Sequence, residues 1–502
     1  MARSLAGLDA AGNLDRAREQ QQLFSQRGLA GVGVGNDGKR AAALDLRFDV
    51  GVFGHNQRLS ARPWPCRRRD RAVPGRRRLQ WDNKSMHPNA LLDACTGLLK
   101  QVLKFDHPAD MVVSRCFREL RLGPRERATV AETIYGVLRK KNLYTYLAQH
   151  GSGPPERRLA ILGFAAPRDF LLGALNEQEQ DWLARCDRVK PSDLMELHRH
   201  NLPQWLVEPL KAQLGDDFWP LVESLNAPAG LDLRVNTLKD KRADVHKELA
   251  RAAIKTVATP YSPWGLRLAD KPQLAKVDAF VRGAIEVQDE GSQLLALLVD
   301  AKRGEMVVDF CAGAGGKTLA LGASMRTTGR LYALDTSAHR LAALKPRLAR
   351  SGLSNVHPVA IAHERDDRIK RLAGKIDRVL VDAPCSGLGT LRRNPDLKWR
   401  HNPKAIEELT AKQTVILQSA ARLVKPGGRL VYATCSILRE ENEAIAEAFS
   451  AANLDFQRLE AAPLLTHIGV EHAEKLCRGP YLRLWPYLHQ TDGFFAAVWQ
   501  KI

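Results

Sequence analysis

The 502-residue chain lacks the cysteine spacing of a structural zinc site. Its eight cysteines form no C-x-x-C pair, and no histidine stands near them at metal-ligand spacing. No apolar run approaches the roughly 18 residues that a membrane-spanning helix needs. The N-terminus also lacks the apolar core of a secretory signal. We therefore expect a cytoplasmic protein that neither holds a metal nor crosses a membrane.

Acidic residues are scarce relative to basic ones. The chain has 56 Asp and Glu against 76 Lys and Arg, a formal net charge of +20. The corresponding pI of about 9.8 favours a polyanionic partner, with nucleic acid as the first expectation. A basic surface that is merely solvated is the alternative.

Residues 1–85 have little sustained periodicity and contain two runs of three arginines, at 67–69 and 76–78. We expect them to be a disordered basic extension. A start codon assigned too far upstream would explain them, because an orderly amphipathic pattern begins at Met86. A basic arm that contacts RNA is the functional alternative.

The rest of the chain divides into three expected domains. Residues 86–228 form a helical domain, because their apolar residues recur with helical period in the segments 90–104, 124–147, 159–175 and 192–225. Residues 229–283 form a small α+β module, with strands at 231–236 and 265–268 and a helix at 242–253. Residues 284–502 form the catalytic domain, which begins near a helix capped by Asp289 or Ser292.

From residue 305 onward, short apolar runs alternate with helical stretches. The expected strands are 306–310, 331–334, 355–361, 378–381 and 430–433, and the expected helices are 317–325, 337–351 and 403–424. Alternation of this kind predicts an α/β fold with a doubly wound, mostly parallel sheet.

A glycine-rich loop follows the first of these strands. It consists of Cys311, Ala312, Gly313, Ala314, Gly315, Gly316 and Lys317. Cys311 occupies the position where a phosphate-binding P-loop needs glycine, which argues against an NTPase. Asp335 ends the next strand, where a carboxylate can bind the ribose hydroxyls of an adenosine-bearing ligand.

Two cysteines stand just past the ends of two further strands. Cys385 follows the strand 378–381 and is close to Asp382, whereas Cys435 follows the strand 430–433. Residues in such positions face the ligand crevice of a parallel sheet. The setting predicts a thiolate nucleophile rather than structural sulfur.

These motifs resemble those of the Fmu/Sun (RsmB-type, NOP/Sun) RNA cytosine-5 methyltransferases, which use S-adenosylmethionine. The matching segments are 233–237, 287–293, 309–318, 382–386, 392–399, 432–436 and 492–495. The resemblance covers roughly residues 190–500. It implies a class I methyltransferase with a Rossmann-like sheet, preceded by an RNA-binding module and a helical domain. It also implies a substrate in ribosomal RNA of the small subunit, with transfer RNA as the alternative.

The resemblance assigns roles to the site residues. Cys435 would be the nucleophile and Cys385 would assist product release, although a likeness to DNA cytosine methyltransferases would reverse the two. Asp382 would be the acid beside the base, and Lys317 would lie near it. The expected cofactor contacts are the loop 311–317, Asp335, Asp382 and Glu364. Glu364, or alternatively His363, would replace an aspartate that is usual after the third strand in the family. The expected RNA contacts are Arg234, Asn236, Arg392, Arg393 and Lys398.

A second reading is an inactive RNA-binding or ribosome-assembly factor on a methyltransferase fold. The intact set of Cys385, Cys435, Asp382 and Lys317 argues against it, because a purely structural protein has no need of these groups. We expect the protein to act as a monomer.

Overall fold

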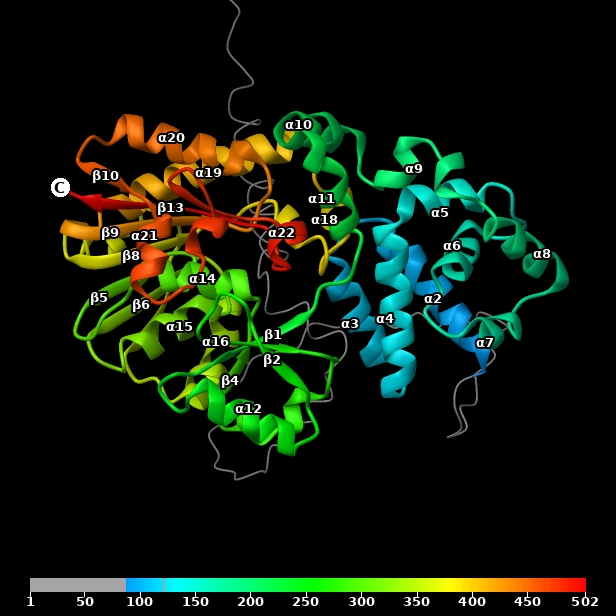
Figure 1. Ribbon diagram of the computed structural model, residues 1–502, viewed down its shortest axis with the longest axis horizontal. Coiled ribbons are helices and arrows are strands. Elements are labelled where there is room, and N and C mark those ends of the chain that lie inside the picture. The colour runs from blue at the N-terminus through cyan, green and yellow to red at the C-terminus, as the bar shows by residue number, and fades with distance from the viewer. Residues whose placement is uncertain (1–86, 121) are drawn as a thin grey trace, which may run out of the picture.

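The computed structural model describes residues 87–120 and 122–502. The predicted basic extension, residues 1–85, lies outside the described residues. Figure 1 shows a helical lobe on the right and a larger lobe, built around a sheet, on the left. A smaller strand-and-helix unit lies below the larger lobe.

The helical lobe contains seven helices among the described residues. They are α2 (Pro88–Val102), α3 (Ala109–Glu119), α4 (Pro124–Arg139), α5 (Lys141–Ala148), α6 (Pro155–Gly163), α7 (Arg168–Leu172) and α8 (Glu177–Cys186). Their apolar faces share one core that includes Leu92, Leu99 and Ile134. The prediction of one helix over 124–147 is wrong, because the chain leaves helical geometry at Lys140, whose ψ is 29°.

Three further helices were predicted as part of the helical domain. They are α9 (Glu196–His200), α10 (Gln204–Leu214) and α11 (Phe218–Leu225). Of these, α9 lies against α5, where the rings of His198 and Tyr146 stack with their centroids 4.2 Å apart, whereas α10 and α11 pack elsewhere. Leu206 of α10 and Leu221 of α11 share an apolar cluster with Leu391 and Trp485 of the large lobe. An amphipathic pattern shows that a helix buries one face, but it does not show which core receives that face.

The small unit is a four-stranded antiparallel sheet in the order β2-β3-β1-β4. Its strands are β1 (Leu231–Val235), β2 (Thr256–Ala258), β3 (Gly265–Leu268) and β4 (Ile285–Val287). The helices α12 (Arg242–Arg251) and α13 (Asp278–Val281) belong to it. Val245 and Leu249 of α12 share a core with Leu233 of β1 and Ile285 of β4. The predicted α+β module is thus present, but its sheet extends through β4, beyond the predicted boundary at residue 283.

The large lobe contains the predicted doubly wound sheet. Its parallel strands are β5 (Met306–Asp309), β6 (Arg330–Asp335), β7 (Val356–Ala360), β8 (Ile376–Asp382) and β9 (Val424–Thr434), in the order β7-β6-β5-β8-β9. The chain leaves β5 toward β6 on one side and returns to β8 on the other. Such a reversal creates a crevice at the carboxyl ends of β5 and β8.

Four strands at the end of the chain were not predicted. They are β10 (Phe456–Leu459), β11 (Cys477–Arg478), β12 (Tyr481–Leu484) and β13 (Phe494–Lys501), and β13 pairs antiparallel with β9. Most residues of β13 are buried, so this strand reads as an apolar run without the alternation that marks a half-exposed strand.

Helices cover both faces of the large sheet (Figure 1). One face carries α14 (Glu290–Val299), α15 (Gly316–Ser324), α16 (Ala338–Ser351) and α21 (Ala461–His467). The other carries α17 (Asp367–Lys370), α19 (Pro403–Ala421) and α20 (Glu443–Ala452). Two short helices, α18 (Leu397–Arg400) and α22 (Pro486–His489), lie where the lobes meet. Within residues 87–120 and 122–502, no helix has the length and hydropathy that crossing a membrane requires.

Candidate active site

Cys385 and Cys435 lie side by side at the carboxyl ends of their strands. They follow β8 and β9, which are neighbours paired through Asp382 and Ala433. The Sγ atoms of Cys385 and Cys435 are 3.1 Å apart. The Cys435 amide also donates a hydrogen bond to the Cys385 sulfur, at 3.4 Å. Two parallel strands have therefore brought together thiols that are fifty residues apart.

Asp382 and Lys317 form an ion pair beside these sulfurs. Lys317 lies in the first turn of α15, and its Nζ is 2.7 Å from Oδ2 of Asp382. Burial lowers the pKa of Lys317, but the Asp382 carboxylate more than offsets this, so the net shift is upward. Lys317 therefore remains a cation, and its charge acts on Cys435.

The environment of Cys435 disfavours its thiolate in the resting protein. A hydrogen bond with Cys385, together with burial and the charge of Asp382, raises the pKa of Cys435 well above its ordinary value. Lys317 acts in the opposite direction without reversing the shift. The chemistry expected from the sequence needs a thiolate, so the proton must leave when a substrate enters.

A buried carboxylate, Asp309, ends β5 just before the glycine-rich loop. Oδ2 of Asp309 accepts a hydrogen bond from Thr318 Oγ1 at 2.7 Å. Its other oxygen, Oδ1, is buried without a hydrogen-bond partner among the described residues. Burial raises the pKa of Asp309 to about 7. A cationic ligand group would satisfy this oxygen and stabilise the charged carboxylate, which fits the ammonium group of S-adenosylmethionine.

The backbone of the same loop is shaped by Asp335. Oδ2 of Asp335 accepts from the Gly313 amide and Oδ1 from the Ser337 amide, each at 2.7 Å. Gly313 has a φ of +56°, and a Cβ there would lie 2.3 Å from a guanidinium nitrogen of Arg340. Each carboxylate oxygen retains acceptor capacity for a ribose hydroxyl. Asp335 at the end of β6 and the loop 311–317 are thus joined by a hydrogen bond, and both are placed to contact one bound adenosyl group.

Glu364 lies in the loop after β7. The carboxylate that holds this loop is Asp366, which accepts from the amides of Ala362 and Arg368 at 2.8 and 2.9 Å. Glu364 forms a 3.9 Å ion pair with Arg365. Within the described residues, no hydrogen bond or ion pair joins Glu364 to Asp335 or Gly313, so its role toward the cofactor stays a prediction.

The structure corrects two of the RNA contacts predicted in the α+β module. Arg234 is 2% exposed, and its Nε donates to Gln288 Oε1 at 2.6 Å. Asn236 is 4% exposed, and its amide donates to the carbonyls of Gly283 and Ser351. Both side chains are used inside the protein, because buried polar groups need internal partners.

The structure also corrects the predicted RNA contacts of Arg393 and Lys398. Arg393 forms ion pairs with Asp289 and Asp492 at 2.8 and 2.7 Å. Lys398 is 1% exposed, and its Nζ donates to the carbonyl of Arg139 at the end of α4. Burial and the nearby Arg139 lower the pKa of Lys398 to about 7.

The segment 392–400 thus joins the lobes instead of facing solvent. Trp399 Nε1 donates to the Leu138 carbonyl, and the Ala109 amide donates to Asp396 Oδ2. Arg392 is partly buried and donates to the Thr491 carbonyl at 3.2 Å. Its contact with RNA stays a prediction.

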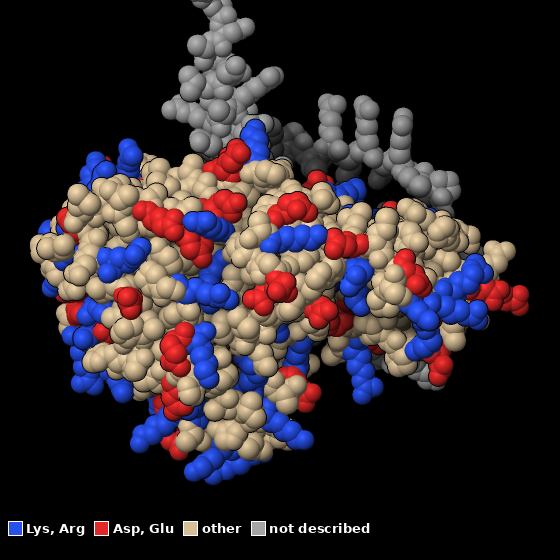
Figure 2. Space-filling view, turned by 45° about the horizontal axis from the view of Figure 1, so that its top comes forward, with Lys and Arg blue, Asp and Glu red and all other residues tan. Residues whose placement is uncertain are grey.

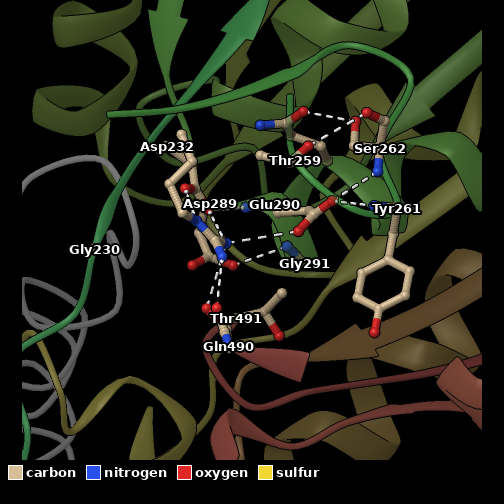
Figure 3. Close-up of polar contacts among 12 residues, drawn as sticks. Gly230, Asp232, Thr259, Tyr261, Ser262, Asp289, Glu290, Gly291, Gln490 and Thr491 are labelled. Carbon is tan, nitrogen blue, oxygen red and sulfur yellow. Dashed lines mark hydrogen bonds and ion pairs between the residues drawn. The ribbon is translucent and has the colours of Figure 1, made fainter. Parts of the chain in front are cut away.

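A second polar cluster anchors the start of α14 (Figure 3). Asp289 caps the helix by accepting from the Gly291 amide at 2.8 Å, which confirms one of the two predicted caps. Figure 3 shows Glu290 accepting from the amides of Tyr261 and Ser262, at 2.6 and 2.7 Å. The motif 287–293 therefore ties the α+β module to the large lobe.

One cluster near the sulfurs was not predicted. The side chains of Ser386, Ser436 and Gln413 all contact the buried carboxylate of Glu441. The sequence offers one weak signal for this cluster, because Cys385 and Cys435 are each followed by a serine. No group of three or more metal-ligating side chains suited to a metal ion occurs in the described part of the chain.

Replacing Asp309 with asparagine is expected to change how stability depends on pH. The pKa of Asp309 is raised in the folded protein, so this group stabilises the fold fully below pH 4. That contribution is lost as the pH rises toward about 7. Asparagine does not titrate, and its oxygen still accepts from Thr318. Urea unfolding across this range should show a flatter curve for Asp309→Asn than for the wild type, whereas parallel curves would contradict the assignment.

Two family models match the chain. One, described as 16S rRNA methyltransferase RsmB/F, matches residues 296–500. The other, described as the ferredoxin-like domain of Methyltr_RsmF/B-like proteins, matches residues 202–275. The second match includes α10 and α11, in agreement with their packing away from the helical core.

The chain is also similar to known proteins over most of its length. A Synechocystis sp. protein named probable ribosomal RNA small subunit methyltransferase B is 30% identical over 440 residues, covering 80% of this chain and 98% of that protein. The crystal structure of PH0851 has a TM-score of 0.69 at 28% identity and covers 84% of this chain and 100% of its own. A methyltransferase homolog from Pyrococcus horikoshii has a TM-score of 0.53 at 29% identity, covering 62% and 100%.

Proposed function

Because this chain belongs to the RsmB/F family of 16S rRNA methyltransferases, we propose that it methylates carbon 5 of a cytosine in small-subunit ribosomal RNA. The reaction would pass through a covalent bond between cysteine and cytosine. The observation that carries this proposal is the pair of sulfurs, 3.1 Å apart, beside the ion pair of Asp382 and Lys317. A methyltransferase that methylates a more nucleophilic atom has no need of two thiols.

Carbon 5 of cytosine is a poor nucleophile until something adds to carbon 6. Cys435 would add there as a thiolate, which makes carbon 5 electron-rich. S-adenosylmethionine, when bound, supplies the electrophilic methyl group that carbon 5 accepts. Cys385 would then take the proton from carbon 5, so that the bond between Cys435 and carbon 6 can break. The close approach of the two sulfurs suits this division of roles.

Entry of the base would have to lower the pKa of Cys435. The hydrogen bond with Cys385 is the leading cause of the raised pKa, and a base between the sulfurs would break it. The Lys317 ammonium would then favour the thiolate. Asp382, whose side chain is 30% exposed, is the acid available to the N3 and amino group of cytosine.

The cofactor would be held by the loop 311–317, with Asp335 toward the ribose. Asp309, missed by the sequence analysis, would pair with the ammonium group through its unpaired oxygen. These residues border the crevice at the carboxyl ends of β5 and β8, as do the two cysteines.

RNA would reach the site across a basic surface. Figure 2 shows Lys and Arg gathered over the small strand-and-helix unit at the bottom of the view, which carries α12 in Figure 1. Its exposed cations include Lys239, Lys241, Lys247, Arg251 and Lys255. We propose these in place of Arg234 and Asn236 as contacts to RNA phosphates. A stacked base cannot reach the sulfurs, so the target cytosine must be unstacked.

Bisulfite sequencing of total RNA, with and without the protein, tests the proposal. We expect one or a few cytosines in small-subunit ribosomal RNA to resist bisulfite conversion in the wild type. In cells that lack the protein, these cytosines should be converted. Protection lost in transfer RNA instead would assign the alternative substrate. An unchanged map would contradict the enzymatic proposal and leave an RNA-binding assembly factor.

A further inference from the structure

Glu441 is a fully buried carboxylate that contacts the loops of both cysteines. It ends the short 3₁₀ helix η6 (Arg439–Glu441), six residues after Cys435 in the chain, and is 0% exposed. Oε1 accepts from the Ser386 amide at 2.8 Å and from Gln413 Nε2 at 3.0 Å. Oε2 accepts from the hydroxyls of Ser386 and Ser436. All four donors thus converge on one side chain.

Ser386 and Ser436 are the residues that directly follow Cys385 and Cys435. Their hydroxyl oxygens are 3.2 Å apart, and the two sulfurs are 3.1 Å apart. The carboxylate therefore fixes the two loops relative to each other at a point one residue beyond each thiol. Two backbone amides also link the loops, since the Cys435 amide donates to the Cys385 sulfur at 3.4 Å and the Gly389 amide donates to the Cys435 carbonyl at 2.8 Å.

Glu441 itself is held rigidly. The Tyr432 hydroxyl donates to the Glu441 carbonyl at 2.7 Å, and the neighbouring Asn442 donates to the Ser436 carbonyl at 2.9 Å. Gln413 of α19 also donates to the Pro384 carbonyl at 3.0 Å, just before Cys385. A rigid acceptor that is hydrogen-bonded to two loops can hold the loops at a fixed distance from each other.

We infer that Glu441 is a positioning residue, which sets the distance between the two sulfurs by accepting hydrogen bonds from both cysteine loops at once. This inference deepens the proposed function, since it concerns the same two thiols. Glu441 touches neither sulfur, so it acts through the loops that carry them. A displacement of about 1 Å in such a site can cost about 10²-fold in rate.

The hydrogen-bond pattern predicts that shape matters more than charge at this position. The groups that donate to Oε1 are the Ser386 amide and the NH₂ group of Gln413, and neither can accept a hydrogen bond. The groups that donate to Oε2 are hydroxyls, which can also accept. In Glu441→Gln, the amide oxygen can replace Oε1 and the NH₂ group can donate to both serines. Glu441→Ala leaves all four groups without this partner.

Phenylarsine oxide bridges two neighbouring thiols, so its binding reports the distance between the sulfurs of Cys385 and Cys435. The assay needs neither RNA nor methyl transfer. The arsenic–oxygen bond of the reagent is replaced by two arsenic–sulfur bonds while both thiol protons leave with the oxygen as water, so no oxidant is needed. We expect full-length Glu441→Ala to bind the arsenical at least about tenfold more weakly than the wild type, and Glu441→Gln to bind within about threefold. Cys385→Ala and Cys435→Ala give the background from the other cysteines.

The same variants should show the effect in turnover. We expect kcat for methyl transfer to fall about 10²-fold in Glu441→Ala with KM for RNA unchanged, and to recover in Glu441→Gln. Glu440→Ala is the matched control, because Glu440 is the exposed neighbour. If Glu441→Ala does not fold, the double variant Ser386→Ala/Ser436→Ala replaces it, and a loss in the same direction is expected.

The two proposals can fail separately. A folded Glu441→Ala protein, or the double serine variant, that binds the arsenical as tightly as the wild type would overturn the positioning role. If Glu441→Ala binds the arsenical more weakly but the wild type methylates no cytosine, the positioning role is upheld and the proposed function is contradicted.

Discussion

Replacing Cys435 with alanine is expected to abolish methyl transfer, and replacing Cys385 with alanine is expected to trap the protein on RNA. The first change removes the nucleophile, a loss of at least about 10³-fold, as for other covalent catalysts. The second leaves the nucleophile but removes the nearby base that would free it. A denaturing gel with labelled RNA should show a slow-migrating adduct for Cys385→Ala and none for Cys435→Ala.

The double variant separates this result from non-specific trapping. Cys385→Ala/Cys435→Ala should form no adduct, since the sulfur that bonds to cytosine is then absent. Cys477→Ala is the control for loss of a thiol elsewhere, because Cys477 is partly buried and stands in β11, not at the ends of β8 and β9. An adduct in Cys435→Ala and none in Cys385→Ala would show that the two cysteines have exchanged roles. Equal activity in both variants would contradict covalent catalysis altogether.

The sequence predicts the sheet because its parallel strands are short apolar runs between helices. The five predicted strands all occur, and each predicted boundary lies within six residues of the observed one. The strands β10 to β13 escaped notice because little in their local pattern distinguishes them from buried loops. The placement of α10 and α11 could not be predicted, since it depends on contacts with Leu391 and Trp485, far along the chain.

The predicted site residues differ in how far local sequence determines them. Cys385, Asp382 and Cys435 follow directly from strand ends, because the carboxyl ends of parallel strands share one edge. Arg393 and Lys398 stand in a basic run that reads as exposed, yet tertiary partners bury both. Glu441 follows another glutamate, Glu440, and nothing local shows that only the second is buried.

Replacing Arg393 with methionine is expected to cause the largest loss of stability among the changes considered. Its guanidinium donates to three partners, Asp492, Asp289 and the Gly230 carbonyl, at 2.7 to 3.0 Å. Methionine leaves two buried carboxylates without their cation. Breaking a buried pair in this way costs about 3–5 kcal/mol in the free energy of unfolding. Urea unfolding at neutral pH measures this loss.

Arg393→Lys should fall between the methionine variant and the wild type, because one ammonium group cannot reach three partners with the planar geometry of a guanidinium. Arg365→Met is the matched control, since Arg365 is exposed and its guanidinium forms a 3.9 Å ion pair with Glu364. A change below about 0.5 kcal/mol is expected there. An equally small change in Arg393→Met would show that Arg393 does not hold the lobe together.

The loss in Arg393→Met should also depend on pH and should reach the active site. Asp492 already has a pKa raised to about 6, with burial as the leading cause. Without Arg393, the folded-state pKa of this carboxyl rises further, so the deficit should be largest above pH 7 and smaller near pH 5. Asp492 precedes Gly493, whose amide donates to the Gly389 carbonyl, and the Gly389 amide donates to the Cys435 carbonyl. Because that chain of backbone contacts ends at the nucleophile, kcat should fall in Arg393→Met even where the protein remains folded.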